Sequence, residues 1–314
     1  MPGPAGAGCR FGDLLAHRVA ERESQVVLGL DPDPMALWPV AESAPGGPRE
    51  GGSAAERAAG AVLAHCRALI EAVAPVCVAA KPQLACFEWL GAPGWGALEA
   101  VVAHAHAHGL LVIADGKRGD IDVTAKAYAS ALLGGVETPF GVAGGLGADA
   151  VTVNPLMGRD AIEPFVLSAR ERGAGVMVLV RTSNPGAADV EDLRLSEGGV
   201  VWERLAALVD GLGGPGVGEA GLSDVGAVVG ATAPEHLARA RELMPHAVFL
   251  LPGVGAQGGR VGDLSPAFAP GRAGGLIAAS RSIAGAHLNT GGAPAAAARA
   301  AAERLREEAW TLVR

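Results

Sequence analysis

The chain has 314 residues and half of them are hydrophobic, enough for a sizeable core in one large α/β domain or two smaller ones. The net charge of −8, without any block of basic residues, argues against a nucleic-acid-binding surface. No apolar run approaches the roughly 18 residues that cross a membrane, and residues 1–9 lack the apolar core of a signal peptide. We therefore expect a soluble protein that binds neither nucleic acid nor membrane.

The spacing of the cysteines indicates the cellular compartment of the protein. Cys9, Cys66, Cys77 and Cys86 show no C-x-x-C spacing, the arrangement typical of zinc sites and redox motifs. We interpret them as reduced thiols of a cytoplasmic protein, with neither a zinc site nor a disulfide framework.

Short apolar runs recur along the chain, and each ends in polar, proline or glycine residues. Such runs are typical of strands that are buried on both faces of a parallel sheet. We predict strands over 26–30, 76–80, 110–114, 148–153, 175–180, 225–229, 247–251 and 275–279. Helix-like spacing covers 11–23, 54–74, a stretch up to 108, 121–133, 161–172, 199–212, 234–243, 261–269 and 293–310.

This alternation of strand and helix predicts a single (β/α)8 TIM barrel over residues 1–314, with a doubly wound open sheet as the alternative. No internal repeat and no linker divides the chain. Three inserts rich in glycine predict flexible loops, near residues 43–53, 134–147 and 211–221.

The first group of candidate site residues is Lys81 with Asp115, Lys117 and Asp120. All four follow the second and third predicted strands, which are neighbours in a barrel and end where barrels place active sites. Adjacent carboxylates keep buried amines protonated, and a rigidly held ammonium can stabilise a developing anion and donate a proton to it. Taken one at a time, these residues have plainer interpretations. Asp115 and Lys117 could form an ion pair at a strand end, and Asp120 could be a helix N-cap.

The second group lies after the last two predicted strands. Glycines over 252–259 let backbone N–H groups approach an anion, and Arg281 offers a fork of donors that matches phosphate oxygens. The loops after strands seven and eight of such barrels often bind phosphate. A G-x-G-x-x-G string occurs here, but it lacks the acidic residue about 20 positions on that a dinucleotide site needs. The plainer interpretation is a tight turn and a surface arginine.

Two further features are weaker. Residues 182–186, which include Ser183, place hydroxyl and amide groups after the fifth predicted strand, but the same residues suit an ordinary turn. His104, His106 and His108 share a helix, yet no acidic or cysteine partner is evident nearby in the sequence. We expect a solvated helix face there and no metal site.

The stretch over 115–121 reads D-G-K-R-G-D-I and resembles the D-A-K-R-G-D-I motif of bacterial orotidine 5′-phosphate decarboxylases. Further segments resemble the same family, so that the resemblance extends over most of the chain: 11–13, 30–32, 81–83, 182–185, 252–258 and 280–283. The resemblance implies a (β/α)8 barrel that works as a homodimer without metal or organic cofactor. It also implies loss of CO2 from C6 of the small-molecule substrate orotidine 5′-phosphate, giving UMP.

The resemblance implies roles for the charged group. Lys81 would contact ribose and join the charge network, Asp115 would lie beside the substrate carboxylate, and Lys117 would protonate C6. Asp120, together with Thr124, would reach into the site of the partner subunit.

Binding residues follow from the same resemblance. Asp31 matches the family's ribose-binding acid, Ser183 its pyrimidine-binding serine, and Gln257 and Arg281 its phosphate ligands. Remote contacts of this kind supply binding energy that can be used at the reacting carbon. One departure lies inside the motif, where Gly116 replaces the usual alanine.

Two other functions remain open. A related sugar-phosphate decarboxylase or aldolase shares a D-x-K-x-x-D motif, but it uses Mg²⁺ and carries an acid where this chain has Lys81, which would repel the metal. A non-catalytic barrel that binds a phosphate ligand is the other possibility, and the presence of all four charged residues argues against it.

Overall fold

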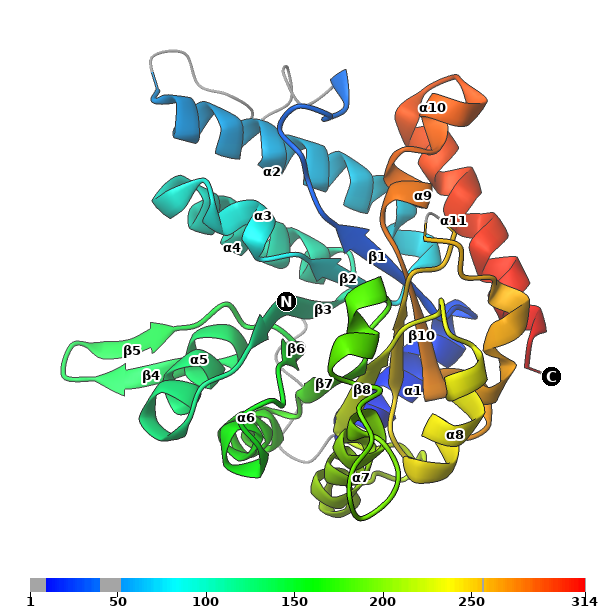
Figure 1. Ribbon diagram of the computed structural model, residues 1–314. Coiled ribbons are helices and arrows are strands. Elements are labelled where there is room, and N and C mark those ends of the chain that lie inside the picture. The colour runs from blue at the N-terminus through cyan, green and yellow to red at the C-terminus, as the bar shows by residue number, and fades with distance from the viewer. Residues whose placement is uncertain (1–9, 40–51, 256, 314) are drawn as a thin grey trace.

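The computed structural model describes residues 10–39, 52–255 and 257–313, and within them eight parallel strands close into a barrel (Figure 1). The barrel strands are β1 (Val26–Leu30), β2 (Ala79–Pro82), β3 (Leu111–Arg118), β6 (Ala150–Val153), β7 (Gly175–Arg181), β8 (Val225–Val229), β9 (Phe249–Pro252) and β10 (Gly275–Ala279). Around the barrel the order is β1-β10-β9-β8-β7-β6-β3-β2. The barrel prediction is therefore confirmed, and the open sheet is excluded.

Helices cover the outside of the barrel in the order expected for β/α units. They are α2 (Ala54–Val73), α4 (Gly91–Ala107), α5 (Asp122–Leu133), α6 (Arg159–Arg172), α7 (Val201–Gly213), α8 (Glu235–Leu243) and α11 (Pro294–Thr311), with shorter helices α3 (Ala85–Glu88), α9 (Arg281–Ala284) and α10 (Ala286–Thr290). Helix α1 (Phe11–Arg22) packs Phe11, Leu15 and Val19 against side chains of the barrel interior, such as Leu111 and Leu276.

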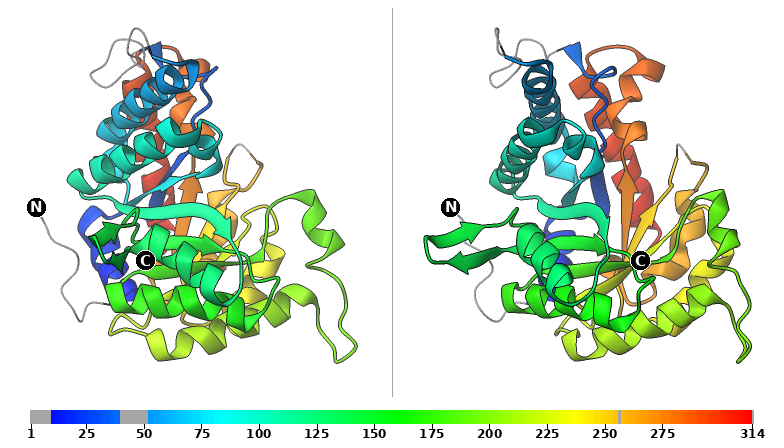
Figure 2. Two further views of the ribbon diagram at one scale, coloured as in Figure 1. Left: turned by 90° about the vertical axis from the view of Figure 1, so that its left-hand side faces the viewer. Right: turned by 60° about the vertical axis from the view of Figure 1, so that its left-hand side comes forward.

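The insert over 134–147 is not the flexible loop that the sequence predicts. Strands β4 (Gly135–Thr138) and β5 (Gly141–Gly144) form an antiparallel hairpin that projects from the barrel (Figure 2). A positive φ of 106° at Gly141 allows the tight turn, and the Phe140 N–H donates to Thr138 Oγ1. Backbone pairing therefore orders this glycine-rich segment.

The structure describes the other two inserts to different extents. Within 211–221, α7 continues to Gly213, a 3-10 turn follows over Gly214–Gly216, and the N–H of Ala220 donates to Asp13. The insert 43–53 lies mostly outside the described residues. At its end, Ser53 caps α2 through reciprocal hydrogen bonds with Glu56.

Two element predictions are wrong in detail. The strand expected over 76–80 begins only at Ala79, because Ala74–Val76 forms a 3-10 turn with Pro75 at its start. The segment expected as an α-helix over 261–269 is instead a 3-10 helix, Val261–Phe268, which contains Pro266. Proline lacks the N–H that an α-helix interior needs.

The continuous helical segment Ala54–Val76 is apolar enough to cross a membrane by length and composition, contrary to the expectation from the sequence. However, 56% of its most apolar stretch is buried inside the protein, where α2 packs against α4 and α11. This burial is that of a core helix.

Two glycines of α4 provide a matched test of packing. A Cβ at Gly94 would lie 1.9 Å from the backbone oxygen of Phe87, whereas nothing lies within 4 Å of a Cβ at Gly96. We expect Gly94→Ala to lower the free energy of unfolding by about 1–3 kcal/mol through overpacking. Gly96→Ala should raise it by about 0.5–1 kcal/mol, because alanine favours the helix. Urea unfolding measures both, and equal effects of the two changes would contradict this packing.

Candidate active site

Polar side chains gather at the carboxyl ends of the barrel strands around a cavity of about 510 Å³. The residues predicted from the sequence that line it are Asp31, Lys81, Asp115, Lys117, Ser183, Gln257 and Arg281. The cavity thus joins the charged group after β2 and β3 to the glycine-rich group after β9 and β10.

An irregularity at the end of β3 presents two of these side chains. Ala114 pairs with Val151 of β6, but the next pairing joins Arg118 to Val153, so β3 carries extra residues there. Lys117 has a positive φ of 46°, an uncommon conformation for a residue with a side chain. Both Asp115 and Lys117 nevertheless face the cavity, as predicted.

Asp115 lies between the two lysines. Lys81 Nζ is 2.5 Å from Asp115 Oδ2, and Lys117 Nζ is 2.6 Å from Oδ1. Lys81 and Asp115 are 8% and 5% exposed, so this pair has little access to water, whereas the side chain of Lys117 is 43% exposed. Removing one partner of such a buried pair commonly costs about 3–5 kcal/mol, because a charge is left uncompensated.

The electrostatics of Asp115 follow from this arrangement. Burial disfavours the charged carboxylate, but the positive charges of Lys81 and Lys117 and their hydrogen bonds outweigh it and hold the pKa of Asp115 at about 2. Asp115 is therefore ionised across the physiological range.

Sequence reasoning missed two supporting residues. Thr152, buried in β6, donates to Asp115 Oδ1 at 2.9 Å and accepts the N–H of Lys117 at 2.9 Å. Gln83 Nε2 lies 3.4 Å from Asp115 Oδ2. The polar Thr152 inside an otherwise apolar strand was the one signal that could have identified it.

The far side of the cavity is built from the loops after β7, β9 and β10. Ser183 Oγ donates to Gln257 Oε1 at 3.0 Å, which joins the first two loops. A Cβ at Gly253, where φ is 102°, would lie 3.2 Å from the same Gln257 oxygen, so glycine permits this close approach. Arg281 begins the short helix α9 and faces the same cavity.

Asp120 and Thr124 lie outside the cavity of their own chain. Thr124 is exposed on α5, and Asp120 Oδ1 accepts the N–H of Ile121 at 2.8 Å. The N-cap of α5 is Ile121, so the plainer interpretation of Asp120 as the N-cap is wrong by one residue. Asp120 is thus not brought to the other three charged residues within one chain.

The substitution of glycine for alanine inside the motif has a packing explanation. A Cβ at Gly116 would lie 2.7 Å from Leu84 Cδ1, and Leu84 is fully buried. In this chain the leucine occupies the space that an alanine methyl group would fill.

Sequence comparisons identify relatives of the chain. A family model described as Orotidine 5′-phosphate decarboxylase / HUMPS family matches residues 24–301. The chain is 48% identical over 241 residues to the orotidine 5′-phosphate decarboxylase of Deinococcus radiodurans, which covers 76% of this chain and 82% of the relative. It is 45% identical over 232 residues to that of Rhodopirellula baltica, which covers 73% of this chain and 74% of the relative.

A comparison with solved structures agrees with the sequence comparisons. The structure of Leishmania donovani OMP decarboxylase superimposes on the chain with a TM-score of 0.70 at 33% sequence identity. The match covers 96% of this chain and 98% of the other.

The depressed pKa of Asp115 predicts a pH-dependent stability. A carboxyl with a folded pKa of about 2 and an unfolded pKa of 3.8 stabilises the fold above pH 4 and loses this contribution as pH falls towards 2. Between pH 5 and pH 2 the parent should lose about 2 kcal/mol more than Asp115→Asn, which carries no titrating group. Urea unfolding at the two pH values measures this difference, and parallel losses would contradict the ion-pair arrangement.

Proposed function

The chain belongs to the orotidine 5′-phosphate decarboxylase / HUMPS family, and from this membership we propose that it converts orotidine 5′-phosphate to UMP and CO2 in pyrimidine biosynthesis. The observation that carries the proposal is the pair of lysine amines, 2.5 and 2.6 Å from the two oxygens of Asp115, at one end of the cavity. This group supplies what decarboxylation needs at the reacting carbon.

The chemistry follows from the charges. When the bond between C6 and the carboxylate breaks, CO2 leaves and the electron pair stays on C6. The ammonium of Lys117 stabilises this developing anion and then donates a proton to C6, and the neutral amine regains a proton from water. Asp115, ionised beside the substrate carboxylate, disfavours the ground state and holds the ammonium in position.

The remaining cavity residues suit the rest of the nucleotide. In the proposed binding mode Asp31 and Lys81 contact ribose, Ser183 contacts the pyrimidine, and Gln257 and Arg281 hold the phosphate. The support is their common cavity and the hydrogen bond between Ser183 and Gln257. Phosphate binding far from C6 provides energy that is used at the reacting carbon.

The proposed reaction requires no metal. Each oxygen of Asp115 already accepts a hydrogen bond from a lysine, and a Mg²⁺ ion there would have to displace a buried ammonium. This arrangement disfavours the Mg²⁺-dependent sugar-phosphate decarboxylase or aldolase. Burying charges is costly, and a non-catalytic barrel that only binds a phosphate ligand does not need a charge network of this kind.

The working unit in this proposal is a homodimer in which Asp120 and Thr124 serve the partner's site. Exposed apolar side chains follow Asp120 in the chain: Ile121 and Val123 are 51% and 75% exposed. Apolar groups gathered on a surface mark contacts with other proteins. A second copy of the chain that covers them would bring its own Asp120 towards the neighbouring cavity.

A cytoplasmic location is also part of the proposal. Within the described chain Cys66, Cys77 and Cys86 are free thiols, and burial raises the pKa of Cys66 and Cys77, the latter to about 12. Cys9 lies outside the described residues. Unpaired, buried cysteines are typical of a reducing compartment.

The absorbance change on orotidine 5′-phosphate turnover tests the function. With chelator present, the parent should be fully active, whereas Lys117→Ala should lose at least about 100-fold, because a positioned proton donor is absent. Lys126→Ala, which changes an exposed lysine of α5, is the matched control and should keep the parent's activity. Turnover that depends on added Mg²⁺ would support the metal-dependent alternative, and UMP binding without turnover would support the non-catalytic one.

Subunit exchange tests the shared site. Mixing inactive Lys117→Ala with inactive Asp120→Ala gives mixed dimers in which one site has both residues and the other has neither. With random pairing half the dimers are mixed, so activity should recover to about a quarter of the parent's. If exchange is confirmed by mass and no activity returns, Asp120 serves its own chain.

A further inference from the structure

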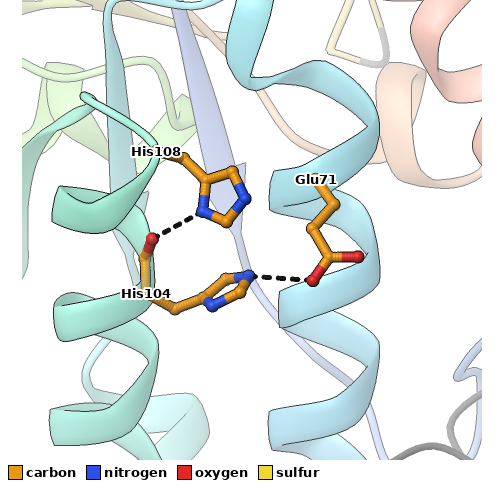
Figure 3. Close-up of side chains that lie close together, drawn as sticks. All are labelled: Glu71, His104 and His108. Carbon is orange, nitrogen blue, oxygen red and sulfur yellow. Dashed lines mark hydrogen bonds and ion pairs between the residues drawn. The ribbon is translucent and has the colours of Figure 1, made fainter.

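Three side chains that could ligate a metal lie close together (Figure 3). They lie at the amino-terminal end of the barrel, because α2 and α4 end where β2 and β3 begin, and the catalytic cavity is at the opposite end. Glu71 lies in the last turn of α2, His104 in the last turn of α4, and His108 is the C-cap of α4. One oxygen of Glu71 and one nitrogen of each histidine lie within 4.8 Å of one another. The sequence shows no acidic partner for these histidines, but the structure supplies one, Glu71, from another helix.

The hydrogen bonding of His108 fixes its tautomer. Its Nδ1 lies 2.9 Å from the backbone oxygen of His104, and a carbonyl oxygen can only accept, so Nδ1 carries the proton. Nε2 is then left with a free lone pair. Bonding of Nδ1–H to a backbone carbonyl is the common way in which proteins orient a metal-ligating histidine.

His104 offers a second nitrogen. Its Nε2 lies 3.1 Å from Glu71 Oε1 but is buried without a hydrogen bond of acceptable geometry. A ring nitrogen that lacks a hydrogen-bond partner is available to a metal ion. Neutral imidazole is the form that binds a metal.

We propose that Glu71, His104 and His108 bind one divalent transition-metal ion of the Zn²⁺ class, separately from the catalytic site. Two nitrogens and one carboxylate oxygen are a ligand set that zinc accepts, and two histidines four residues apart on a helix are a familiar part of such sites. Tetrahedral Zn²⁺ holds its ligand atoms about 3.3 Å apart. His104 and Glu71 already have about this spacing, and one nitrogen of His108 lies within 4.8 Å of both ligand atoms.

The surroundings favour a cation at this position. The ligands lie at the carboxyl ends of α2 and α4, where the helix dipoles present partial negative charge. An open cavity lined by Glu21, Glu23, Glu71 and His108 adjoins the group, so ions and a fourth, water ligand have access. Arg22 and Arg306 also line this cavity, but Arg22 is occupied by backbone carbonyls that include those of Ala74 and Cys77.

The ion would join two helices that are packed side by side in the outer layer (Figures 1 and 2). An ion that binds only the folded chain stabilises it by mass action. The amino-terminal end of a TIM barrel contributes to stability, and its active site lies at the other end. The role of the ion is therefore structural, and its test needs no measurement of activity.

Metal-free protein titrated with Zn²⁺ tests the proposal. We expect one ion per chain by equilibrium dialysis and a Tm that rises by about 4 °C at a Zn²⁺ concentration one hundred times Kd. Co²⁺ in place of Zn²⁺ should give the visible absorption of a four-coordinate site. Glu71→Gln, which changes a side chain that is 57% exposed, should weaken Zn²⁺ binding at least about 10-fold without disturbing the fold.

Two more variants complete the design. His108→Gln should weaken binding as Glu71→Gln does. The control is His106→Gln, in the same helix, because His106 pairs with Asp149 at 2.9 Å and lies outside the group. This variant should bind Zn²⁺ as the parent does. Absence of stoichiometric binding, or equal weakening in the control and the two ligand variants, would overturn the proposal.

Discussion

The ionised carboxylate of Asp115, held between the amines of Lys81 and Lys117, is the interaction on which the arrangement of the candidate site depends. The three groups come from two neighbouring strands, and Thr152 from a third strand fixes the same carboxylate oxygen. Opposite charges that are already in contact need little reorganisation when a negative charge develops beside them. The closed barrel matters here because it holds the ends of β2, β3 and β6 at fixed spacing.

The irregular end of β3 shows how the fold keeps this group in place. The positive φ of Lys117 is a strained conformation, which persists only when its surroundings determine it. The N–H of Lys117 donates to Thr152, and Arg118 forms an ion pair with Glu88 and lies over the ring of Tyr128. Anchors on both sides of the strained residue thus offset the cost of presenting its amine to the cavity.

Much of the fold and the composition of the site could be predicted from the sequence, because both leave local patterns. Apolar runs identify buried strands, and the charges of Lys81, Asp115 and Lys117 follow directly after such runs. The register shift in β3 left no such pattern, because it depends on pairing with β6. Thr152 and Glu71 were missed for the same reason: each acts through a partner that is distant in the sequence. The hairpin at 135–144 was missed because glycine-rich composition resembles that of a loop.

The charged motif divides between two places, the cavity and the surface outside it. In a regular strand, side chains two residues apart point to the same side, so Asp115 and Lys117 would share one side while the chain continued in the same direction. Here β3 carries extra residues before Arg118 and Lys117 has a positive φ of 46°. The N–H of Asn154 donates to the Arg118 oxygen at 2.7 Å, which holds the end of β3 against the end of β6. Lys117 lines the cavity, whereas Asp120 does not. Within one chain Asp120 is separate from the other three charged residues, and this separation is the structural basis for the proposal that it serves a neighbouring copy.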